Sequence, residues 1–251
     1  MTLEDFFALH DNCAVCFSGG CDSAYLLYEA MKSAKSVCAY YVRSAFQPQV
    51  DLEDAKKIAD MLHAHLTIVD IDVLSDTKIR ENSTLRCYYC KKAIMAAVKK
   101  QAEKDGKPVI LDGTNASDEV SDRPGMKALE EEGILSPLRL CGLTKKDIRE
   151  SSKLAGLSTW DKPANACLAT RIPCGTELSL CQLQIIETVE DGLRKLGFSD
   201  FRVRERGSTA RLEVPIQQLS MAIWQRYEIL GILQPYFSDI VLDLKGRKGT
   251  D

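Results

Sequence analysis

The chain lacks any long hydrophobic run. No apolar stretch in its 251 residues approaches the ~18 residues that a membrane-spanning helix needs. The first residues, Met1 to Phe7, also lack the basic start and the apolar segment of a secretory signal peptide. We therefore predict a cytoplasmic protein without a membrane partner.

The chain also has no excess of positive charge and very little histidine. Its 33 Lys and Arg against 36 Asp and Glu give a net charge of −3, which argues against a nucleic-acid partner held over a broad surface. The three histidines, His10, His63 and His65, stand in no zinc-binding spacing. Ten cysteines are present, and in a cytoplasmic protein they are expected to be reduced thiols, metal ligands or catalytic groups rather than disulfides.

Strand and helix patterns alternate along the first two thirds of the chain. Short apolar runs predict strands at 13–17, 36–43, 66–69 and 109–111. Amphipathic stretches predict helices at 22–34, 48–63, 88–104 and 145–155. This alternation predicts an α/β fold with a doubly wound, mostly parallel sheet.

The pattern changes from Thr176 onward. A long helix up to Gly197 is followed by alternating strands at 201–204 and 210–214, a helix near 216–232 and a last strand at 239–244. We therefore expect two domains: an α/β domain over residues 1–170 and a smaller α+β domain over residues 176–251.

The segment Ser18-Gly19-Gly20-Cys21-Asp22-Ser23 joins the first predicted strand to the first predicted helix. Its glycines allow backbone N–H groups to approach an anion, and the helix N-terminus adds to the attraction. The Ser18 and Ser23 hydroxyls suit phosphate oxygens, whereas Asp22 suits Mg²⁺ or a backbone amide. The loop is not a Walker A motif, because the Gly-Lys-Ser/Thr ending is missing. A Gly-Gly turn that only caps a helix is the alternative.

This loop resembles the PP-loop of the ATP-pyrophosphatase superfamily. The resemblance implies ATP with Mg²⁺, adenylation of a carbonyl or carboxylate oxygen with release of pyrophosphate, and displacement of AMP by a nucleophile. Phosphate would be held by Ser18, Gly19, Gly20 and Ser23, and Asp22 would serve the metal. Ligands of such sheets lie beyond the carboxyl ends of the strands, so a second stretch should face the same site through Asp112, Thr114, Asn115 and Asp118.

Further motifs narrow the resemblance. They are Asp112-Gly113-Thr114-Asn115 with Asp118, Asp122-Arg123-Pro124-Gly125, and Lys162-Pro163 followed by Ala166-Cys167-Leu168 and Arg171-Ile172-Pro173. With Arg86-Cys87-Tyr88-Tyr89-Cys90-Lys91, they resemble the LarE family of ATP-dependent sulfur transferases over roughly residues 13–214. The resemblance implies a mononucleotide substrate, pyridinium-3,5-biscarboxylic acid mononucleotide, whose carboxylate is adenylated and becomes a thiocarboxylate for a nickel-pincer cofactor. It also implies a homo-oligomer, a hexamer.

The cysteine that matches the family's sulfur donor is Cys167. In one route its thiolate, favoured by the cations Lys162 and Arg171, attacks the acyl-adenylate and loses its sulfur to leave dehydroalanine. Cys174 and Cys181 extend a C-x₆-C-x₆-C spacing. Three such thiolates could ligate three irons of a [4Fe-4S] cluster and leave the fourth iron for exogenous sulfide. The sequence leaves both routes open.

Two further groups carry candidate roles. Cys87 and Cys90 form a CxxC pair near a helix start, which suits either a redox dithiol or simple packing. Arginine suits phosphate through its planar fork, although a solvated strand face is the alternative. The candidates for the substrate's phosphate are Arg171, Arg204, Arg206 and Arg211.

Three other functions compete with sulfur transfer to a small molecule. The excess of acidic residues and the absence of paired zinc-binding CxxC modules argue against a PP-loop tRNA thiolation enzyme. The length of the chain argues against an amidotransferase-like synthetase, because it leaves no room for a glutaminase domain. A non-catalytic nucleotide-binding regulator would not need Asp22 and both serines of the loop.

Overall fold

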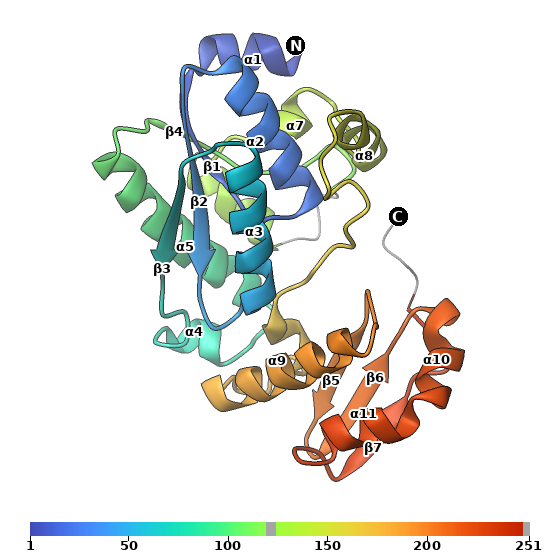
Figure 1. Cartoon of the computed structure of the whole chain (residues 1–251). Coiled ribbons are helices and arrows are strands. Elements are labelled where there is room, and N and C mark those ends of the chain that lie inside the picture. The colour runs from blue at the N-terminus through green and yellow to red at the C-terminus, as the bar shows by residue number, and fades with distance from the viewer. Residues whose placement is uncertain (119–123, 248–251) are drawn as a thin grey trace. The chain divides into compact units, whose positions relative to one another are not determined.

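The computed structural model describes residues 1–118 and 124–247 (Figure 1). Its contacts divide the chain into two compact units. The first comprises Met1–Val73 and Leu85–Lys162, and the second comprises Leu74–Thr84 and Pro163–Asp251. A short segment from the first half of the chain, Leu74–Thr84, therefore belongs with the C-terminal part. The domain limits expected from the sequence, 1–170 and 176–251, stay a prediction.

A four-stranded parallel sheet forms the centre of the first unit. Its order is β3-β2-β1-β4, and Val15 stands opposite Ala39 on one side and Leu111 on the other. The strands are β1 (Asn12–Cys16), β2 (Ser36–Arg43), β3 (Leu66–Asp70) and β4 (Val109–Leu111). The α/β fold with a mostly parallel sheet is confirmed.

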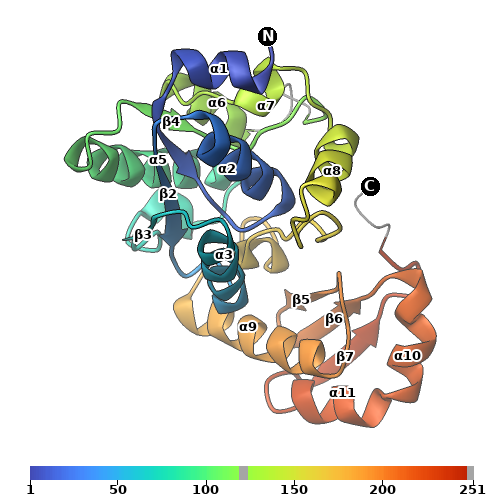
Figure 2. The same cartoon turned by 45° about the horizontal axis from the view of Figure 1, so that its top comes forward.

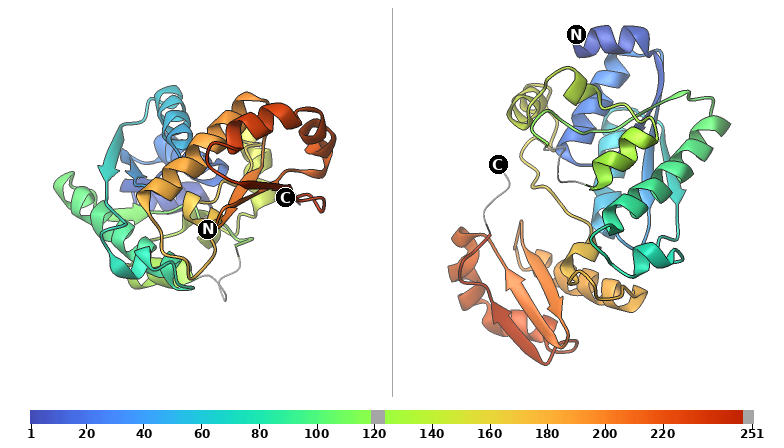
Figure 3. Two further views of the ribbon diagram at one scale, coloured as in Figure 1. Left: turned by 90° about the horizontal axis from the view of Figure 1, so that it is seen from below. Right: turned by 180° about the vertical axis from the view of Figure 1, so that it is seen from behind.

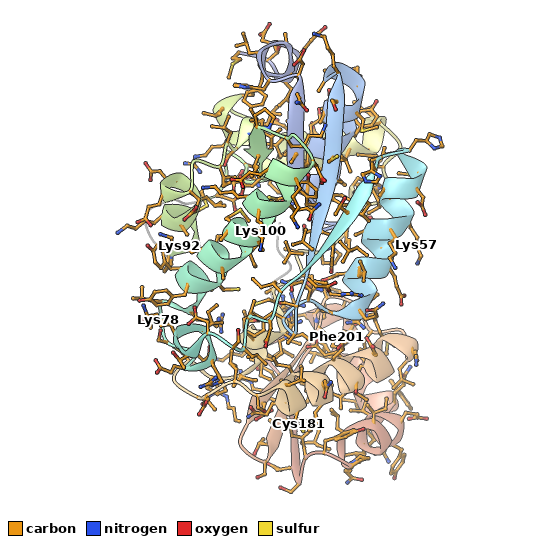
Figure 4. All side chains as sticks on the ribbon, turned by 90° about the vertical axis from the view of Figure 1, so that its left-hand side faces the viewer. Lys57, Lys78, Lys92, Lys100, Cys181 and Phe201 are labelled. Carbon is orange, nitrogen blue, oxygen red and sulfur yellow. The ribbon has the colours of Figure 1, made fainter. Side chains whose placement is uncertain are left out.

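Helices cover both faces of this sheet, as Figures 1 and 2 show and as Figure 3 shows from behind. Successive residues of a strand point to opposite faces, so Val15 packs with Leu26 and Ala55 while Ala14 packs with Val98. In Figure 4 the helix carrying Lys57 and the helix carrying Lys100 stand on opposite sides of the strands. The helices of the first unit are α1 (Leu3–Leu9), α2 (Cys21–Ser33), α3 (Gln49–Met61), α5 (Arg86–Lys104), α6 (Pro124–Glu131), α7 (Pro137–Leu140) and α8 (Lys145–Leu154).

The second unit is a smaller mixed α+β structure. Its strands β5 (Arg202–Arg206), β6 (Thr209–Glu213) and β7 (Asp239–Leu242) pair antiparallel and then parallel. Their apolar side chains pack against Leu193 of α9 and Leu233 of α11. The other elements are α4 (Thr77–Arg80), the 3₁₀ turns η1 (Leu168–Arg171) and η2 (Ile216–Gln218), α9 (Leu180–Lys195), α10 (Leu219–Trp224) and α11 (Arg226–Leu233).

The one helix predicted near 216–232 is divided in two. Gln225 leaves helical geometry with ψ 25° and serves both as the end of α10 and as the start of α11. Its N–H donates to the Met221 carbonyl and its own carbonyl accepts from the Ile229 N–H, so the break leaves these groups paired. Across the described parts of the chain, no helix is both long and apolar enough to cross a membrane.

Candidate active site

The loop between β1 and α2 has the geometry of an anion site. Gly19 has φ +71°, and a Cβ there would lie 3.1 Å from the backbone nitrogen of Ala55 in α3, so the position requires glycine. The Ser18 and Ser23 hydroxyl oxygens lie 3.1 Å apart, and the Ser18 N–H donates to Ser23 Oγ. No side-chain cap is found at the N-terminus of α2, at Gly20, within the described residues. Its first amide donors are therefore available to an anion.

The second predicted stretch adjoins this loop. A Cβ on Gly113, two residues beyond β4, would lie 3.0 Å from the backbone nitrogen of Ser23 and 3.4 Å from the carbonyl carbon of Asp22. Such a distance leaves no room for a side chain at Gly113. The structure thus brings residues 112–118 against the start of α2, as the parallel sheet led us to expect.

Most side chains of this second stretch bond within the first unit. Asp112 accepts from the Thr114 hydroxyl at 2.6 Å and from the Ser136 hydroxyl at 2.5 Å. Asn115 is 3 % exposed, and its N–H donates to Asp118. These contacts shape the loop, whereas direct nucleotide contacts by the same four residues stay a prediction. Of the neighbouring sequence motif, Asp122 and Arg123 lie outside the described residues.

A lysine that the sequence analysis did not single out completes the loop. Lys145, the first residue of α8, places Nζ 2.7 and 2.8 Å from the two carboxylate oxygens of Asp22. Its backbone N–H donates to the Ser117 hydroxyl, so Lys145 ties α8 both to the start of α2 and to the segment that follows β4. The two residues of this ion pair lie 123 positions apart in the chain.

A second lysine contacts the glycine turn itself. Lys162 Nζ donates to the Gly19 carbonyl at 3.2 Å and to Asp54 of α3 at 2.9 Å. A cavity of about 330 Å³ opens beside it and is lined in part by Asp54 and Thr159. The Thr159 hydroxyl is buried and finds no hydrogen-bond partner among the described residues. The Thr159 hydroxyl is thus a buried polar group without a partner at the edge of this cavity, within the residues that the structure describes.

In the second unit, Cys167 stands directly before η1 and is partly exposed. Its carbonyl oxygen accepts from the Thr170 N–H at 3.0 Å, from the Thr170 hydroxyl at 2.8 Å and from Arg171 Nη1 at 3.3 Å. Arg171 also donates to the Ala166 carbonyl at 2.7 Å and makes two contacts, of 2.9 and 3.0 Å, with Glu190 of α9. The Arg171 and Glu190 side chains are 1 % and 2 % exposed. The segment around Cys167 is thus fastened to α9 through a buried ion pair.

This arrangement bears on the arginines proposed to bind phosphate. Arg171 has its donors on Glu190 and on backbone carbonyls, so a phosphate could reach it only by breaking that pair. Arg204 donates to the Thr170 carbonyl at 2.7 Å and to Glu213 at 2.8 Å, while Arg211 pairs with Asp243 at 2.5 Å. Arg206, at the end of β5, is exposed. Their phosphate role stays a prediction, for which Arg206 is the most accessible of the four.

Arg202 is a further arginine on this strand that sequence reasoning did not assign. It is 6 % exposed and donates to the Ala164 carbonyl at 2.8 Å. Burial, together with the charges of Arg171 and Arg247, lowers the pKa of Arg202 to about 10. Three arginines, 171, 202 and 204, therefore hold backbone carbonyls of the segment that carries Cys167.

The remaining candidate cysteines do not gather. Cys174 and Cys181 are exposed, and Cys174 Sγ lies 3.2 Å from the Asn82 carbonyl; Figure 4 labels Cys181 on α9. Within residues 1–118 and 124–247, no three His, Cys, Asp or Glu side chains lie together in a way that could hold a metal ion. As they lie, the three predicted cluster cysteines do not fit a [4Fe-4S] centre. In the first unit, Cys87 is exposed and accepts from Arg86 at 3.5 Å.

The doubly wound sheet with Ser-Gly-Gly-x-Asp-Ser at the first strand–helix turn defines the PP-loop class of ATP-using proteins. The model of the family described as "Queuosine biosynthesis protein QueC" matches residues 12–110, which include this turn.

Three relatives extend the similarity to nearly the whole chain. The pyridinium-3,5-bisthiocarboxylic acid mononucleotide synthase of Lactiplantibacillus plantarum is 34% identical, over 92% of this chain and 85% of its own length. The uncharacterized protein slr1717 of Synechocystis is 32% identical over 97% of this chain and 92% of its own. The uncharacterized protein MJ0830 of Methanocaldococcus jannaschii is 32% identical over 92% and 88%. The chain belongs to the LarE family. It is an ATP-using sulfurtransferase.

Proposed function

We propose that this enzyme adenylates a carboxylate of pyridinium-3,5-biscarboxylic acid mononucleotide and replaces one oxygen of that carboxylate with sulfur. The proposal is carried by the similarity to the Lactiplantibacillus plantarum synthase over 92% of the chain, together with a phosphate loop in one unit and a partly exposed Cys167 in the other. The product would be a thiocarboxylate that serves a nickel-pincer cofactor.

In the first step a substrate carboxylate oxygen attacks the α-phosphorus of ATP. The bond between the α-phosphorus and its bridging oxygen breaks, pyrophosphate leaves, and an acyl-adenylate forms. The amides at the start of α2 and the Ser18 and Ser23 hydroxyls would bind the phosphates. Asp22 would hold Mg²⁺, because proteins commonly bind this ion through one or two carboxylates together with the substrate's phosphates. The bound Mg²⁺ would neutralise negative charge on the phosphates.

In the second step the Cys167 thiolate attacks the acyl carbon, and AMP leaves with its bonding electron pair. The resulting thioester then loses the Cα proton of residue 167, the Cβ–S bond breaks, and the thiocarboxylate departs with the sulfur. Dehydroalanine remains in the chain, so each chain delivers one sulfur. The sulfur is not assigned to a [4Fe-4S] cluster, because Cys167, Cys174 and Cys181, as they lie in the described part of the chain, do not fit one.

The test is a single turnover with ATP, Mg²⁺ and the dicarboxylate mononucleotide. Mass spectrometry should find the thiocarboxylate product, AMP and pyrophosphate, and a loss of ~34 Da at Cys167, which is the H₂S removed when cysteine becomes dehydroalanine. Cys167→Ala should abolish the product, whereas Cys174→Ala, a change in the same segment, should not.

Iron and acid-labile sulfide, measured on protein purified without oxygen, test the other source of sulfur. About four irons and four sulfides per chain that disappear in Cys174→Ala, with no mass loss at Cys167, would replace the sacrificial route by the cluster route. Absence of the thiocarboxylate in every preparation would refute the proposed substrate.

A further inference from the structure

The carbonyl oxygen of Cys167 accepts hydrogen bonds from more donors than it has lone pairs. It has two lone pairs, yet it faces three donors, which are the Thr170 N–H, the Thr170 hydroxyl and the Arg171 guanidinium. The first of these is the ordinary bond of the 3₁₀ turn. The other two come from side chains, and one of them is a cation.

The cation is fixed in place. Arg171 is 1 % exposed, is held by Glu190, and has Nη1 3.1 Å from Thr170 Oγ1, so the two side-chain donors also contact each other. Arg204 holds the carbonyl of Thr170 from β5. Donors fixed in this way need little reorganisation when charge appears on the oxygen they face, which is the condition for strong electrostatic stabilisation.

We infer that Thr170 and Arg171 are catalytic residues for the release of sulfur from Cys167, acting on the carbonyl oxygen of Cys167 itself. This inference rests on the proposed function, in particular on Cys167 as the sulfur source. Loss of the Cα proton places negative charge on the adjacent carbonyl oxygen, where the three donors stabilise it.

The elimination balances without any further reagent. The Cα–H bond breaks and its proton passes to solvent water. The electron pair left on Cα forms the Cα=Cβ double bond, and the Cβ–Sγ bond breaks with its pair going to Sγ. The sulfur departs as the thiocarboxylate anion, and no oxidant or reductant is consumed.

Thr170→Val is the decisive variant, because valine keeps the shape of threonine and removes only the hydroxyl. Pyrophosphate release and formation of the covalent Cys167–substrate adduct should stay at the wild-type rates, since they precede elimination. Conversion of the adduct to dehydroalanine should slow about 10- to 100-fold, so the adduct accumulates in the mass spectrum. Thr170→Ser should restore the rate because it restores the hydroxyl.

Thr188→Val is the matched control. The Thr188 hydroxyl also donates to a backbone carbonyl at 2.8 Å, that of Gln184 in α9 of the same unit, but it does not contact Cys167. This variant should eliminate at the wild-type rate. Equal slowing in both valine variants would mean that general loosening of the unit is responsible, and the inference would fail.

An isotope measurement separates catalysis from positioning. In Thr170→Val protein that contains Cα-deuterated cysteine, elimination should be slower than in protonated protein, because removal of the Cα proton then limits the rate. The absence of an isotope effect, or slower adduct formation with unchanged elimination, would overturn the inference. A wild-type protein that makes product with no mass loss at Cys167 would instead refute the proposed sulfur source.

Discussion

The buried pair of Arg171 and Glu190 allows a quantitative prediction. The two side chains are 1 % and 2 % exposed and meet through two contacts of 2.9 and 3.0 Å. Glu190 also accepts from the Val203 N–H of β5 at 2.9 Å. Glu190→Gln keeps the size of the side chain but removes the charge, so Arg171 remains buried without its counter-ion. Removing one partner of a buried pair costs about 3–5 kcal/mol.

Native-state hydrogen exchange of the β5 amides is the suitable assay, because it follows the second unit by itself in a chain whose two units need not unfold together. A loss of about 3–5 kcal/mol should reduce the protection of these amides by roughly two to three and a half powers of ten. Amides of β1, in the first unit, serve as the internal control and should stay protected.

A double-mutant cycle shows whether the ion pair itself is responsible. Arg171→Met should cost as much as Glu190→Gln or more, because it leaves a buried carboxylate and also removes donors from the Ala166 and Cys167 carbonyls. The double variant contains neither buried charge, so its cost should fall well below the sum of the two single costs. Strictly additive costs, or a Glu190→Gln loss below about 1 kcal/mol, would refute the reasoning from a desolvated pair.

Three further predictions concern the first unit. Asp22→Ala should abolish ATP-dependent AMP release without changing the circular dichroism spectrum; unchanged release would refute the assignment of the ATP site. Lys145→Ala should weaken ATP binding about tenfold or more in calorimetry, since it leaves the negative charge of Asp22 without its partner beside the phosphate loop, whereas the exposed neighbour Lys146→Ala should bind normally. Burial raises the pKa of the Cys13 thiol to about 11 from an ordinary 9.0, so at pH 8 iodoacetamide should label exposed Cys87 and spare Cys13. Because the unfolded chain loses that proton first, stability should fall as pH rises from about 9 to 11; rising stability there would contradict the burial argument.

Local sequence patterns were sufficient to predict the sheet. All four strands of the first unit lie where short apolar runs were seen, since a strand buried on both faces needs nearly continuous apolar residues. Gly19 was likewise visible, because the glycine pair follows directly on a strand. Gly113 is explained only by tertiary structure, as its constraint is the backbone of Ser23 at 3.0 Å, 90 residues earlier in the chain.

The charges of the site could not be predicted in the same way. Lys145 meets Asp22 through two helices that pack side by side, and no spacing in the sequence encodes that pairing. For the arginines, residue type alone could not decide whether they bind phosphate, because a guanidinium suits phosphate and backbone carbonyls equally well. Burial decides between these partners. The Arg171 side chain is 1 % exposed and pairs with Glu190, so its donors are used within the protein, whereas Arg206 is exposed and accessible to a ligand.

The two kinds of arginine therefore suggest different experimental signatures. An arginine that binds substrate phosphate should affect substrate affinity and leave the protection of β5 unchanged. An arginine that holds the Cys167 segment should affect amide protection and the elimination step together, because the same guanidinium bonds both Glu190 and the Cys167 carbonyl. Measuring both quantities for each arginine would separate recognition from sulfur release without any assumption about how the two units are placed.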